Sequence, residues 1–490
     1  PMNRTGSFAI TALASFLLAL GCDGTPDPEA DAGADSGAGQ PDAGRDAGPP
    51  PPEDAGPPPD GGPTGCTEGC AFVELALGSS FTCARRENGE VWCWGRNQEG
   101  QLGTGRRRHS DCAAVGSEPV DCSGVAVPVR ALEGGSVVQV RDAIAMSARG
   151  GSTCIVREGR GVWCWGFEGT PPPGGGMPAI RLEARAIAGF ESADGVANAH
   201  HHICALYAED GHAVCFGYNG DGQLGLGHRE DPIPMPRGSV LGEGGAGTLT
   251  GIVELVGSSF ATTCARTDTG VYCWGNNDSN QFGDGLLAHD AERCGGTMIT
   301  SYDCSSTPVR VGDPSEPLTD VAQLALGSQH ACALGNDGVV RCWGDNRAGQ
   351  AGQPPSMSTV PLPTEVPGMT GVTQIATTSR FTCALKSDGT VWCWGYNLHG
   401  QLGDGIADHG VAGSSDNCTP TTSESGDCSG DPVQVAGIDD ATHIGTGGSH
   451  ACAIRASGEL WCWGYNDTRQ LGNNSRETSF TPVRVIGLPD

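Results

Sequence analysis

The sequence predicts an all-β fold, a seven-bladed β-propeller of four-stranded antiparallel blades. The first observation is a Cys-aromatic-Gly element that occurs seven times, at intervals of 51 to 71 residues. Repeats of this length are typical of propellers and related repeat architectures. The second is a further cysteine nine to eleven residues before each element. The third is a composition of 79 glycines, 33 prolines and 17% charged residues, which suits short strands joined by many turns.

The first residues of the chain resemble an export signal. Phe8 to Gly21 is a small, apolar run that is too short to span a bilayer but long enough for a signal peptide. It ends in Ala19-Leu20-Gly21-Cys22, which resembles a bacterial lipobox. We therefore expect residues 1–21 to be a lipoprotein signal peptide and Cys22 to carry the lipid. An ordinary secretory signal with an incidental cysteine is the alternative.

Residues 22–65 have the composition of a disordered linker. From residue 23 onward the segment has no Val, Ile, Leu, Met, Phe, Trp or Tyr, and it has ten acidic residues against the single Arg45. Such a segment cannot form a core, and its charges repel one another. We expect a spacer between the lipid and a propeller formed by residues 66–490.

The number of cysteines indicates disulfides and an oxidising compartment. Of 23 cysteines, the 22 other than Cys22 all fall in close pairs, which is typical of exported proteins. Buried reduced thiols are the alternative. The predicted repeat pairs are Cys83–Cys93, Cys154–Cys164, Cys204–Cys215, Cys264–Cys273, Cys332–Cys342, Cys383–Cys393 and Cys452–Cys462, and the others are Cys112–Cys122, Cys294–Cys304, Cys418–Cys428 and Cys66–Cys70.

Each repeat contains four strand-like pieces. In the fifth repeat, two apolar segments between Val321 and Leu334 precede the turn Asn336-Asp337-Gly338. A loop of this kind ending in glycine is a hairpin signal, and it places Cys332 directly opposite Cys342, within disulfide range. We therefore expect each repeat pair to join the two strands of one hairpin.

The fourth piece is a short Pro-Val strand, such as Pro482-Val483-Arg484-Val485. Proline suits the first position of a strand or an edge strand. If this strand pairs within the following blade, the last one completes the first blade and closes the ring. The sequence leaves that register open.

A glycine-rich loop follows the third piece, as in Gly95 to Gly103, and the second repeat has Pro171-Pro172-Pro173 in its place. The Trp-Gly, Gly-Gln-Leu-Gly and Pro-Val-Arg-Val elements recur in fixed order, and together they resemble the repeats of the regulator of chromosome condensation family over about residues 71 to 488. The resemblance implies a seven-bladed propeller. The paired cysteines are not part of the usual family pattern and look like an exported variant.

Familiar catalytic and ligand-binding motifs find little support. Gly220 to Gly225 matches G-x-G-x-x-G, but it is one copy of the repeated loop and no helix pattern follows it. His200-His201-His202 suggests a metal, yet His202 occupies a repeat position that His330 and His450 share. G-x-S-x-G and H-E-x-x-H are absent. We expect no catalytic, cofactor or metal site, and the net charge of −29 disfavours nucleic acid as a partner.

Three inserted loops are the strongest indication of function. They occur in repeats one, four and six, between the glycine loop and the Pro-Val strand, and each ends in Asp-Cys-Ser. We expect them to project from one face at the corners of a triangle, with disulfides that lower the entropy cost of binding. Protection of long loops outside the cell is the alternative reason for the disulfides. The candidate partner-binding residues are Arg106, Arg107, Arg108, Met298, Tyr302, Tyr218, Tyr396 and Tyr465.

The sequence thus predicts an exported, lipid-anchored propeller in the cell envelope, periplasmic or at the cell surface, that binds another protein through one face. Its membrane contact is expected through the N-terminal lipid alone. One alternative is a hydrolase or lyase with a composite site at the mouth of the central channel. The other, guanine-nucleotide exchange by family analogy, fits poorly with export.

Overall fold

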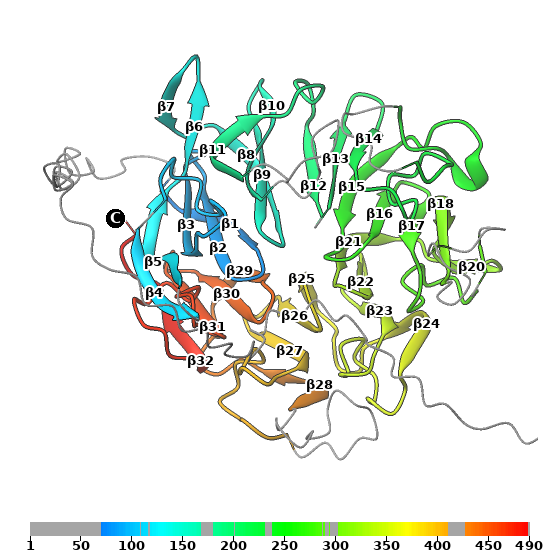
Figure 1. The fold of residues 1–490 in the computed structure, drawn as a ribbon. Helices are drawn as coiled ribbons and strands as arrows, with labels where there is room; N and C mark the ends of the chain where they lie inside the picture. The colour runs from blue at the N-terminus through cyan, green and yellow to red at the C-terminus, as the bar shows by residue number, and fades with distance from the viewer. Residues whose placement is uncertain are drawn as a thin grey trace, which may run out of the picture. The chain divides into compact units, whose positions relative to one another are not determined.

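The computed structural model describes residues 70–107, 109–115, 118–167, 180–199, 201–230, 238–286, 288–289, 294, 302–409 and 427–488. These residues lie within one compact unit, Asp60–Asp490. They form seven blades of mainly antiparallel strands around a central axis (Figure 1), which confirms the predicted seven-bladed propeller. Within these ranges the helical structure is one 3-10 turn, Glu243–Gly245, and no helix is long and apolar enough to cross a membrane.

Blades 4 to 7 have the predicted four strands in the order of the sequence. Blade 4 comprises β15 (Ile252–Gly257), β16 (Thr262–Thr267), β17 (Gly270–Asn276) and β18 (Cys304–Arg310). Blade 5 comprises β21 (Val321–Leu326), β22 (His330–Gly335), β23 (Val340–Asp345) and β24 (Thr359–Glu365), and the two-residue strands β19 (Gly312–Asp313) and β20 (Glu316–Pro317) precede it. Blade 6 comprises β25 (Val372–Thr377), β26 (Phe381–Lys386), β27 (Val391–Tyr396) and β28 (Cys428–Gln434), and blade 7 comprises β29 (Ala441–Thr446), β30 (His450–Arg455), β31 (Leu460–Gly464) and β32 (Ser479–Arg484).

Blades 1 to 3 depart from four strands. Blade 1 has five: β1 (Phe72–Leu77), β2 (Phe81–Arg86), β3 (Val91–Arg96), β4 (Ser110–Val115) and β5 (Glu118–Pro128). Blade 2 has six: β6 (Arg130–Glu133), β7 (Ser136–Gln139), β8 (Ala143–Arg149), β9 (Ser152–Arg157), β10 (Gly161–Phe167) and β11 (Ile180–Ala186). Blade 3 has three, β12 (Gly195–Asn198), β13 (His202–Tyr207) and β14 (His212–Gly217), and the single bridge Val214–Ser239 stands where its fourth strand would be.

When strands are counted outward from the channel, a disulfide joins the second and third strands of every blade. Cys332 lies opposite Cys342 in the ladder of β22 and β23, as the hairpin register requires, and the other six pairs occupy the same place. The two Cα atoms are 4.0 to 4.1 Å apart in all seven. The sulfur atoms are buried, so the disulfides form part of the core.

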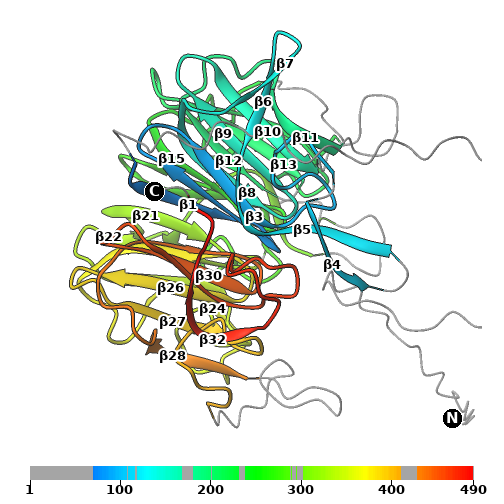
Figure 2. The same ribbon diagram turned by 90° about the vertical axis from the view of Figure 1, so that its left-hand side faces the viewer.

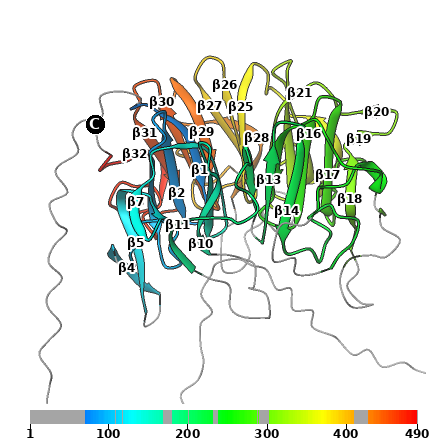
Figure 3. The same ribbon diagram turned by 90° about the horizontal axis from the view of Figure 1, so that it is seen from above.

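The Pro-Val strands pair within their own blades. In blade 1, Trp92 of β3 lies opposite Pro128 of β5, and in blade 7, Trp461 of β31 lies opposite Arg484 of β32. The last strand therefore adds nothing to the first sheet. Instead, blades 7 and 1 meet through a buried cluster that includes Phe72, Trp94 and Leu471, and Figure 3 shows the blades stacked side by side around the ring.

A tryptophan hydrogen bond joins neighbouring blades at six of the seven seams. The indole of the Cys-Trp-Gly element is fully buried, and its N–H donates to the main-chain carbonyl of the glutamine in the glycine loop of the preceding blade. Gly283, at φ +68°, leaves room for the ring of Trp343, because a Cβ atom there would lie 2.6 Å from it. The six N–H to O distances are Trp94–Gln470 2.9 Å, Trp165–Gln101 2.8 Å, Trp274–Gln223 2.9 Å, Trp343–Gln281 2.7 Å, Trp394–Gln350 3.0 Å and Trp463–Gln401 2.9 Å.

The seam between blades 2 and 3 lacks this bond. Repeat two has no Gly-Gln-Leu-Gly loop to supply the carbonyl, and repeat three has Phe216 in place of tryptophan. Phe216 meets Phe190 edge to face, with ring centroids 5.4 Å apart. Both partners of the polar contact are thus replaced by an apolar pair.

Candidate functional site

The three inserted loops leave the ring at equivalent points. The second cysteine of each loop lies opposite the residue that follows the Cys-Trp-Gly element: Cys122 opposite Arg96, Cys304 opposite Asn276 and Cys428 opposite Tyr396. Loops after the third strand and loops after the first strand lie at the same end of an antiparallel blade. The three loop bases therefore share one face of the ring, here called the loop face.

Disulfides join the two ends of these loops. Cys112 is bonded to Cys122 and Cys294 to Cys304, with Cα atoms 5.8 and 6.0 Å apart. Cys428 and Cys70 are also disulfide-bonded, while Cys418 and Cys66, which the sequence pairs with them, lie outside the described residues. In blade 1 the loop is the hairpin of β4 and β5, which projects from the ring in Figure 2.

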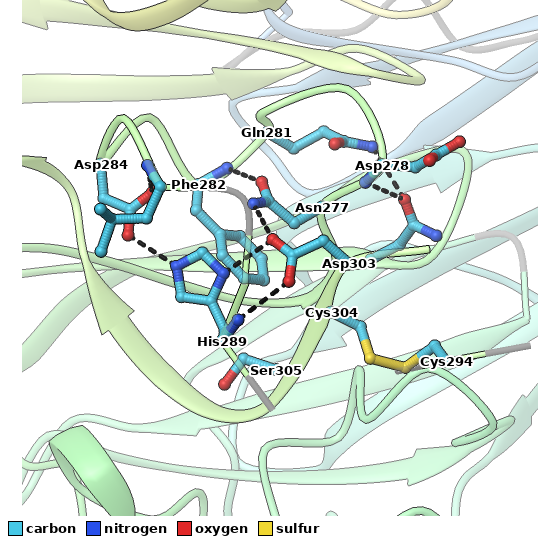
Figure 4. Close-up of polar contacts among 12 residues, drawn as sticks. Asn277, Asp278, Gln281, Phe282, Asp284, His289, Cys294, Asp303, Cys304 and Ser305 are labelled. Atoms are coloured by element: carbon cyan, nitrogen blue, oxygen red, sulfur yellow. Dashed lines mark hydrogen bonds and ion pairs between the residues drawn. A yellow bond between two sulfur atoms is a disulfide. The ribbon is translucent and has the colours of Figure 1, made fainter. Parts of the chain in front are cut away.

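In blade 4, a histidine held between two aspartates fixes the base of the loop (Figure 4). His289 Nε2 lies 2.6 Å from Asp284 Oδ2, and His289 Nδ1 lies 2.7 Å from Asp303 Oδ2. Asp303 also accepts hydrogen bonds from the main-chain N–H of His289 and from the side-chain amide of Asn277, at 3.0 and 2.6 Å. These contacts tie the start of the loop at Asp284 to its end at Asp303.

Blade 6 repeats this arrangement closely. His409 Nε2 lies 2.9 Å from Asp404, and its Nδ1 lies 2.8 Å from Asp427. The side-chain amide of Asn397 donates to Asp427 at 2.6 Å. We call these histidine–aspartate arrangements the loop clamps.

Blade 1 has a clamp with one difference. His109 donates its main-chain N–H to Asp121 at 2.7 Å, but its Nε2 meets the hydroxyl of Thr104 at 2.8 Å rather than a carboxylate. Asn97 again donates to Asp121, at 2.6 Å. The clamp is therefore a shared device of the three loop-bearing blades, with one carboxylate fewer in blade 1.

In blades 4 and 6 the clamps hold their histidines charged at neutral pH. Burial alone would lower the pKa of His289, but its hydrogen bonds to Asp284 and Asp303 outweigh burial and raise that pKa to about 9. The hydrogen bond to Asp427 likewise outweighs burial and, with Asp404, raises the pKa of His409 to about 9. Both ring nitrogens of each imidazolium have a partner, so neither can act as a base at neutral pH. The clamps are therefore structural.

Exposed side chains follow each clamp at equivalent positions. Thr104, Asp284 and Asp404 of the clamps are each followed by a glycine. The residue after this glycine is Arg106 in blade 1, Leu286 in blade 4 and Ile406 in blade 6. Leu286 is 51% exposed and Ile406 is 49% exposed, and Arg106 and its neighbour Arg107 are exposed too. Each preceding glycine donates its N–H to the fourth strand of the next blade, at 2.7 to 3.1 Å. The backbone is thus fixed while the side chains face solvent.

The other candidate contact residues divide into three groups. Arg108 and Met298 lie outside the described residues. Tyr302 is half-buried, and its hydroxyl donates to Asp221 of blade 3, so its polar group is engaged within the protein. Tyr218 is 41% exposed, Tyr396 packs against Ala348 and Cys428, and Tyr465 donates to Asp467 at 2.6 Å beside the ring of His399.

The repeat histidines bind the next blade, as the repeat position implies. The hydroxyl of Thr382 donates to the carbonyl of Gln350, so it accepts from Nε2 of His330 at 2.9 Å. Burial lowers the pKa of His330 to about 4, which keeps the ring neutral. His202 and His450 make the same contact with Thr263 and Thr82. Among the described residues, no cluster of three or more histidine, cysteine or acidic side chains suits a metal ion.

An arginine crosses the central channel near the loop face. Arg149, at the end of β8, donates to the carbonyl of Leu326 in blade 5 at 2.6 Å and to that of Thr377 in blade 6 at 3.2 Å. Two acids on the innermost strands are engaged as well, since Glu74 pairs with Arg85 at 2.6 Å and Glu254 pairs with Arg266 at 2.9 Å. Arg149, Glu74 and Glu254 are thus each tied to a neighbouring group.

Sequence reasoning missed the clamps and the channel arginine. The clamp histidines did leave a signal, because a histidine five residues after Thr104, Asp284 or Asp404 occurs in the loop-bearing repeats ahead of Asp-Cys-Ser. Arg149 left none, since its contacts depend on the ring bringing blade 2 opposite blades 5 and 6.

Comparison with known proteins agrees with the repeat pattern. Two descriptions of the Regulator of chromosome condensation (RCC1) repeat match this chain. One matches residues 72–101, 253–281, 321–350, 372–401 and 441–470, and the other matches 88–141, 268–334, 388–454 and 457–490.

Individual relatives are distant in sequence. The Ultraviolet-B receptor UVR8 of Arabidopsis thaliana is 25% identical over 405 residues, which cover 81% of this chain and 78% of that protein. The RCC1 domain-containing protein RUG3, mitochondrial, also of Arabidopsis thaliana, is 29% identical over 49% of this chain and 48% of its own length. The E3 ubiquitin-protein ligase HERC2 of Homo sapiens is 25% identical over 67% of this chain, a match that spans 7% of its length.

The crystal structure of human WBSCR16 has the same fold. It aligns with a TM-score of 0.57 at 20% identity, over 81% of this chain and 94% of that one. With the repeats matched along most of the ring and the seven blades in place, this chain belongs to the regulator of chromosome condensation (RCC1) repeat family.

Proposed function

We propose that this protein is an exported, lipid-anchored propeller that binds another protein through its loop face. The observation that carries the proposal is that three loop bases at equivalent points share one construction, with a clamp in each and a described disulfide in blades 1 and 4. A loop that is already ordered loses less entropy on binding, so this construction favours recognition.

The chemistry of the loop bases favours a protein partner. Leu286 and Ile406 offer apolar contacts, whereas Arg106 and Arg107 offer positive charge on a molecule whose net charge is −29. A partner with apolar residues and carboxylates at matching places would suit this face. The same net charge argues against nucleic acid.

The proposed location rests on the N-terminal sequence and the cysteines. Residues 1–21 have the pattern of a lipoprotein signal peptide, with Cys22 as the lipidated residue and residues 22–65 as a spacer. The disulfides within the propeller are those of a protein that folds in an oxidising compartment. The membrane would be reached through the lipid, in the periplasm or at the cell surface.

Site-specific photocrosslinking in cells tests the binding face. A photoreactive amino acid replaces Arg106, Leu286 or Ile406, and matched control positions are Asn88 and Asp388, in turns between second and third strands at the opposite face. We expect the loop-face positions to crosslink one common protein and the controls to crosslink none. Equal crosslinking from both faces would contradict the proposal.

Metabolic labelling with a fatty acid tests the anchor separately. We expect label on the full chain and no label on the Cys22→Ser variant. A labelled variant, or an unlabelled native chain, would contradict the anchor without affecting the binding face.

A further inference from the structure

The hairpin of β6 and β7 connects blade 1 to blade 2 and lies beside the base of the blade 1 loop, because a Cβ atom on Gly105 would lie 3.5 Å from Cγ1 of Val137. The hairpin has no role in the proposed function. Its turn is Gly134-Gly135, with φ +54° and +88°, the conformation of a tight two-residue hairpin turn. β7 forms the outer edge of the six-stranded sheet of blade 2. In Figures 1 and 2 the hairpin reaches beyond the remaining strands of that blade.

The register of the hairpin shows which main-chain groups of β7 are unused. The pair next to the turn, Glu133 and Ser136, is hydrogen-bonded, and bonded and non-bonded pairs alternate from there. Val137 and Gln139 therefore occupy non-bonded positions opposite Leu132 and Arg130. Their N–H and C=O groups point away from β6, toward the free edge.

The side chains of this edge are apolar and exposed. Val137 is 45% exposed and Val138 is 38% exposed, although successive residues of a strand point to opposite faces. Both faces of β7 thus present a β-branched side chain to solvent. Such an edge is a template for another strand unless it is protected.

The outer strands of other blades are protected by proline. β18, β24, β28 and β32 form the outer edges of blades 4 to 7, and each contains at least one proline, which has no N–H to donate. β7 contains none. The outer strand of blade 2 therefore keeps all its main-chain N–H groups, whereas proline removes at least one N–H from the outer strand of each of blades 4 to 7.

We propose that β7 is a binding site for an extended strand of a partner protein, which adds to blade 2 as a further antiparallel strand. Only an extended chain places N–H and C=O groups at the spacing that Val137 and Gln139 require. β-Branched residues on both faces of the incoming strand would cover Val137 and Val138. A second copy of this chain is a poor occupant, because two molecules of net charge −29 repel each other.

A synthetic peptide provides the probe. It is a capped, fluorescently labelled peptide of alternating valine and threonine flanked by lysines, and its binding to the full-length protein is followed by fluorescence anisotropy. We expect saturable binding with a dissociation constant on the order of 100 µM. Absence of binding at about 1 mM peptide would overturn the proposal.

Two protein variants distinguish strand addition from nonspecific binding of the peptide. Val137→Pro removes an N–H that points outward and leaves the bonds between β6 and β7 intact, so we expect it to weaken binding about tenfold or more. Val137→Thr keeps the N–H and should retain binding within about threefold. Equal binding by the native protein and Val137→Pro, with unchanged melting temperatures, would overturn the proposal.

The peptide itself supplies a test that does not depend on protein folding. Methylation of the amides on both edges of the strand should abolish binding, and methylation of the amides on one edge alone should leave it largely intact, because the peptide can turn its unmodified edge to β7. Equal loss from both peptides would overturn strand addition. Sedimentation of the native protein alone tests the remaining occupant: a dimer that dissociates in Val137→Pro would replace the partner strand by a second copy.

Discussion

Phe216 illustrates, at the scale of a single residue, how a repeat adapts to its neighbour. In six blades the indole N–H of a buried tryptophan finds a glutamine carbonyl across the seam. Repeat two lost the loop that carries this glutamine, so a tryptophan at position 216 would bury an N–H without that acceptor. Phenylalanine fills the seam without this requirement.

This account predicts that restoring the repeat consensus is harmful. Phe216→Trp should destabilise the protein by about 1 to 3 kcal/mol, from an unsatisfied N–H and overpacking. Trp394→Phe should cost only about 1 kcal/mol, because the carbonyl of Gln350 keeps the hydroxyl of Thr382 as a donor. Urea unfolding with the disulfides intact measures both, and a stabilised Phe216→Trp variant would contradict the argument.

At the scale of the element, the loop clamps couple the inserted loops to pH. The folded-state pKa values of His289 and His409 are raised to about 9, above the ordinary value of 6.5. A raised pKa means that the charged clamp contributes its full stability below about pH 6.5, and that this contribution is lost as the pH rises through about 9. The clamp of blade 1 has a different composition, because the hydroxyl of Thr104 stands where blades 4 and 6 have a carboxylate.

Imidazole NMR signals can check this prediction in blade 6. His289 and His409 should titrate near pH 9, and Asp404→Thr, which reproduces the residue found in blade 1, should lower the pKa of His409. The variant should also lose about 2 kcal/mol of stability at pH 7, as for a lost hydrogen bond to a charged group. The difference from the native protein should vanish above pH 9. An unchanged pKa in Asp404→Thr would show that Asp404 does not hold the ring charged.

The whole molecule depends on its cross-links. Nine described disulfides each close a loop of nine to eleven residues. A loop of this length contributes about 2 to 3 kcal/mol, so their sum exceeds the stability of about 5 to 15 kcal/mol that is typical of folded proteins.

The reduced and alkylated chain is therefore expected to remain unfolded after removal of denaturant. Circular dichroism of the oxidised and the reduced, alkylated protein compares the two states directly. A reduced chain that regains the spectrum of the native protein would show that the blades are stable without cross-links.

The ring is also expected to open first at one seam. Blades 2 and 3 lack the tryptophan bond, and the sheet of blade 3 has three strands. Amides of β12 should therefore exchange with solvent faster than those of the equivalent strand β25 in blade 6. Hydrogen exchange followed by mass spectrometry compares peptides from the two strands. Slower exchange in β12 would show that the contact of Phe190 with Phe216 stabilises its seam at least as well as the tryptophan–glutamine hydrogen bond stabilises the others.

Sequence patterns predicted the parts of the structure that recur. The spacing of Cys332 and Cys342 predicted a hairpin register, and the interval between copies predicted the number of blades. The register of the Pro-Val strands stayed open, because the pattern within one repeat is the same whichever blade the strand joins. Arg149 was invisible for a different reason: its partners Leu326 and Thr377 lie some two hundred residues away, and only ring closure brings their carbonyls to it.

The pairing of each Pro-Val strand within its own blade has a consequence for how the chain can be rearranged. In the part of the chain that the structure describes, no sheet shares strands from distant parts of the sequence, and Leu488 packs in the same cluster as Phe72. The order of the blades could therefore be permuted, with residue 488 joined to residue 70 by a short linker and new ends opened between blades 5 and 6. Such a permuted chain keeps every strand in its original sheet. Gain or loss of a whole repeat would likewise leave the hydrogen bonds of the remaining sheets intact, which makes the single blade the unit by which this ring can grow or shrink.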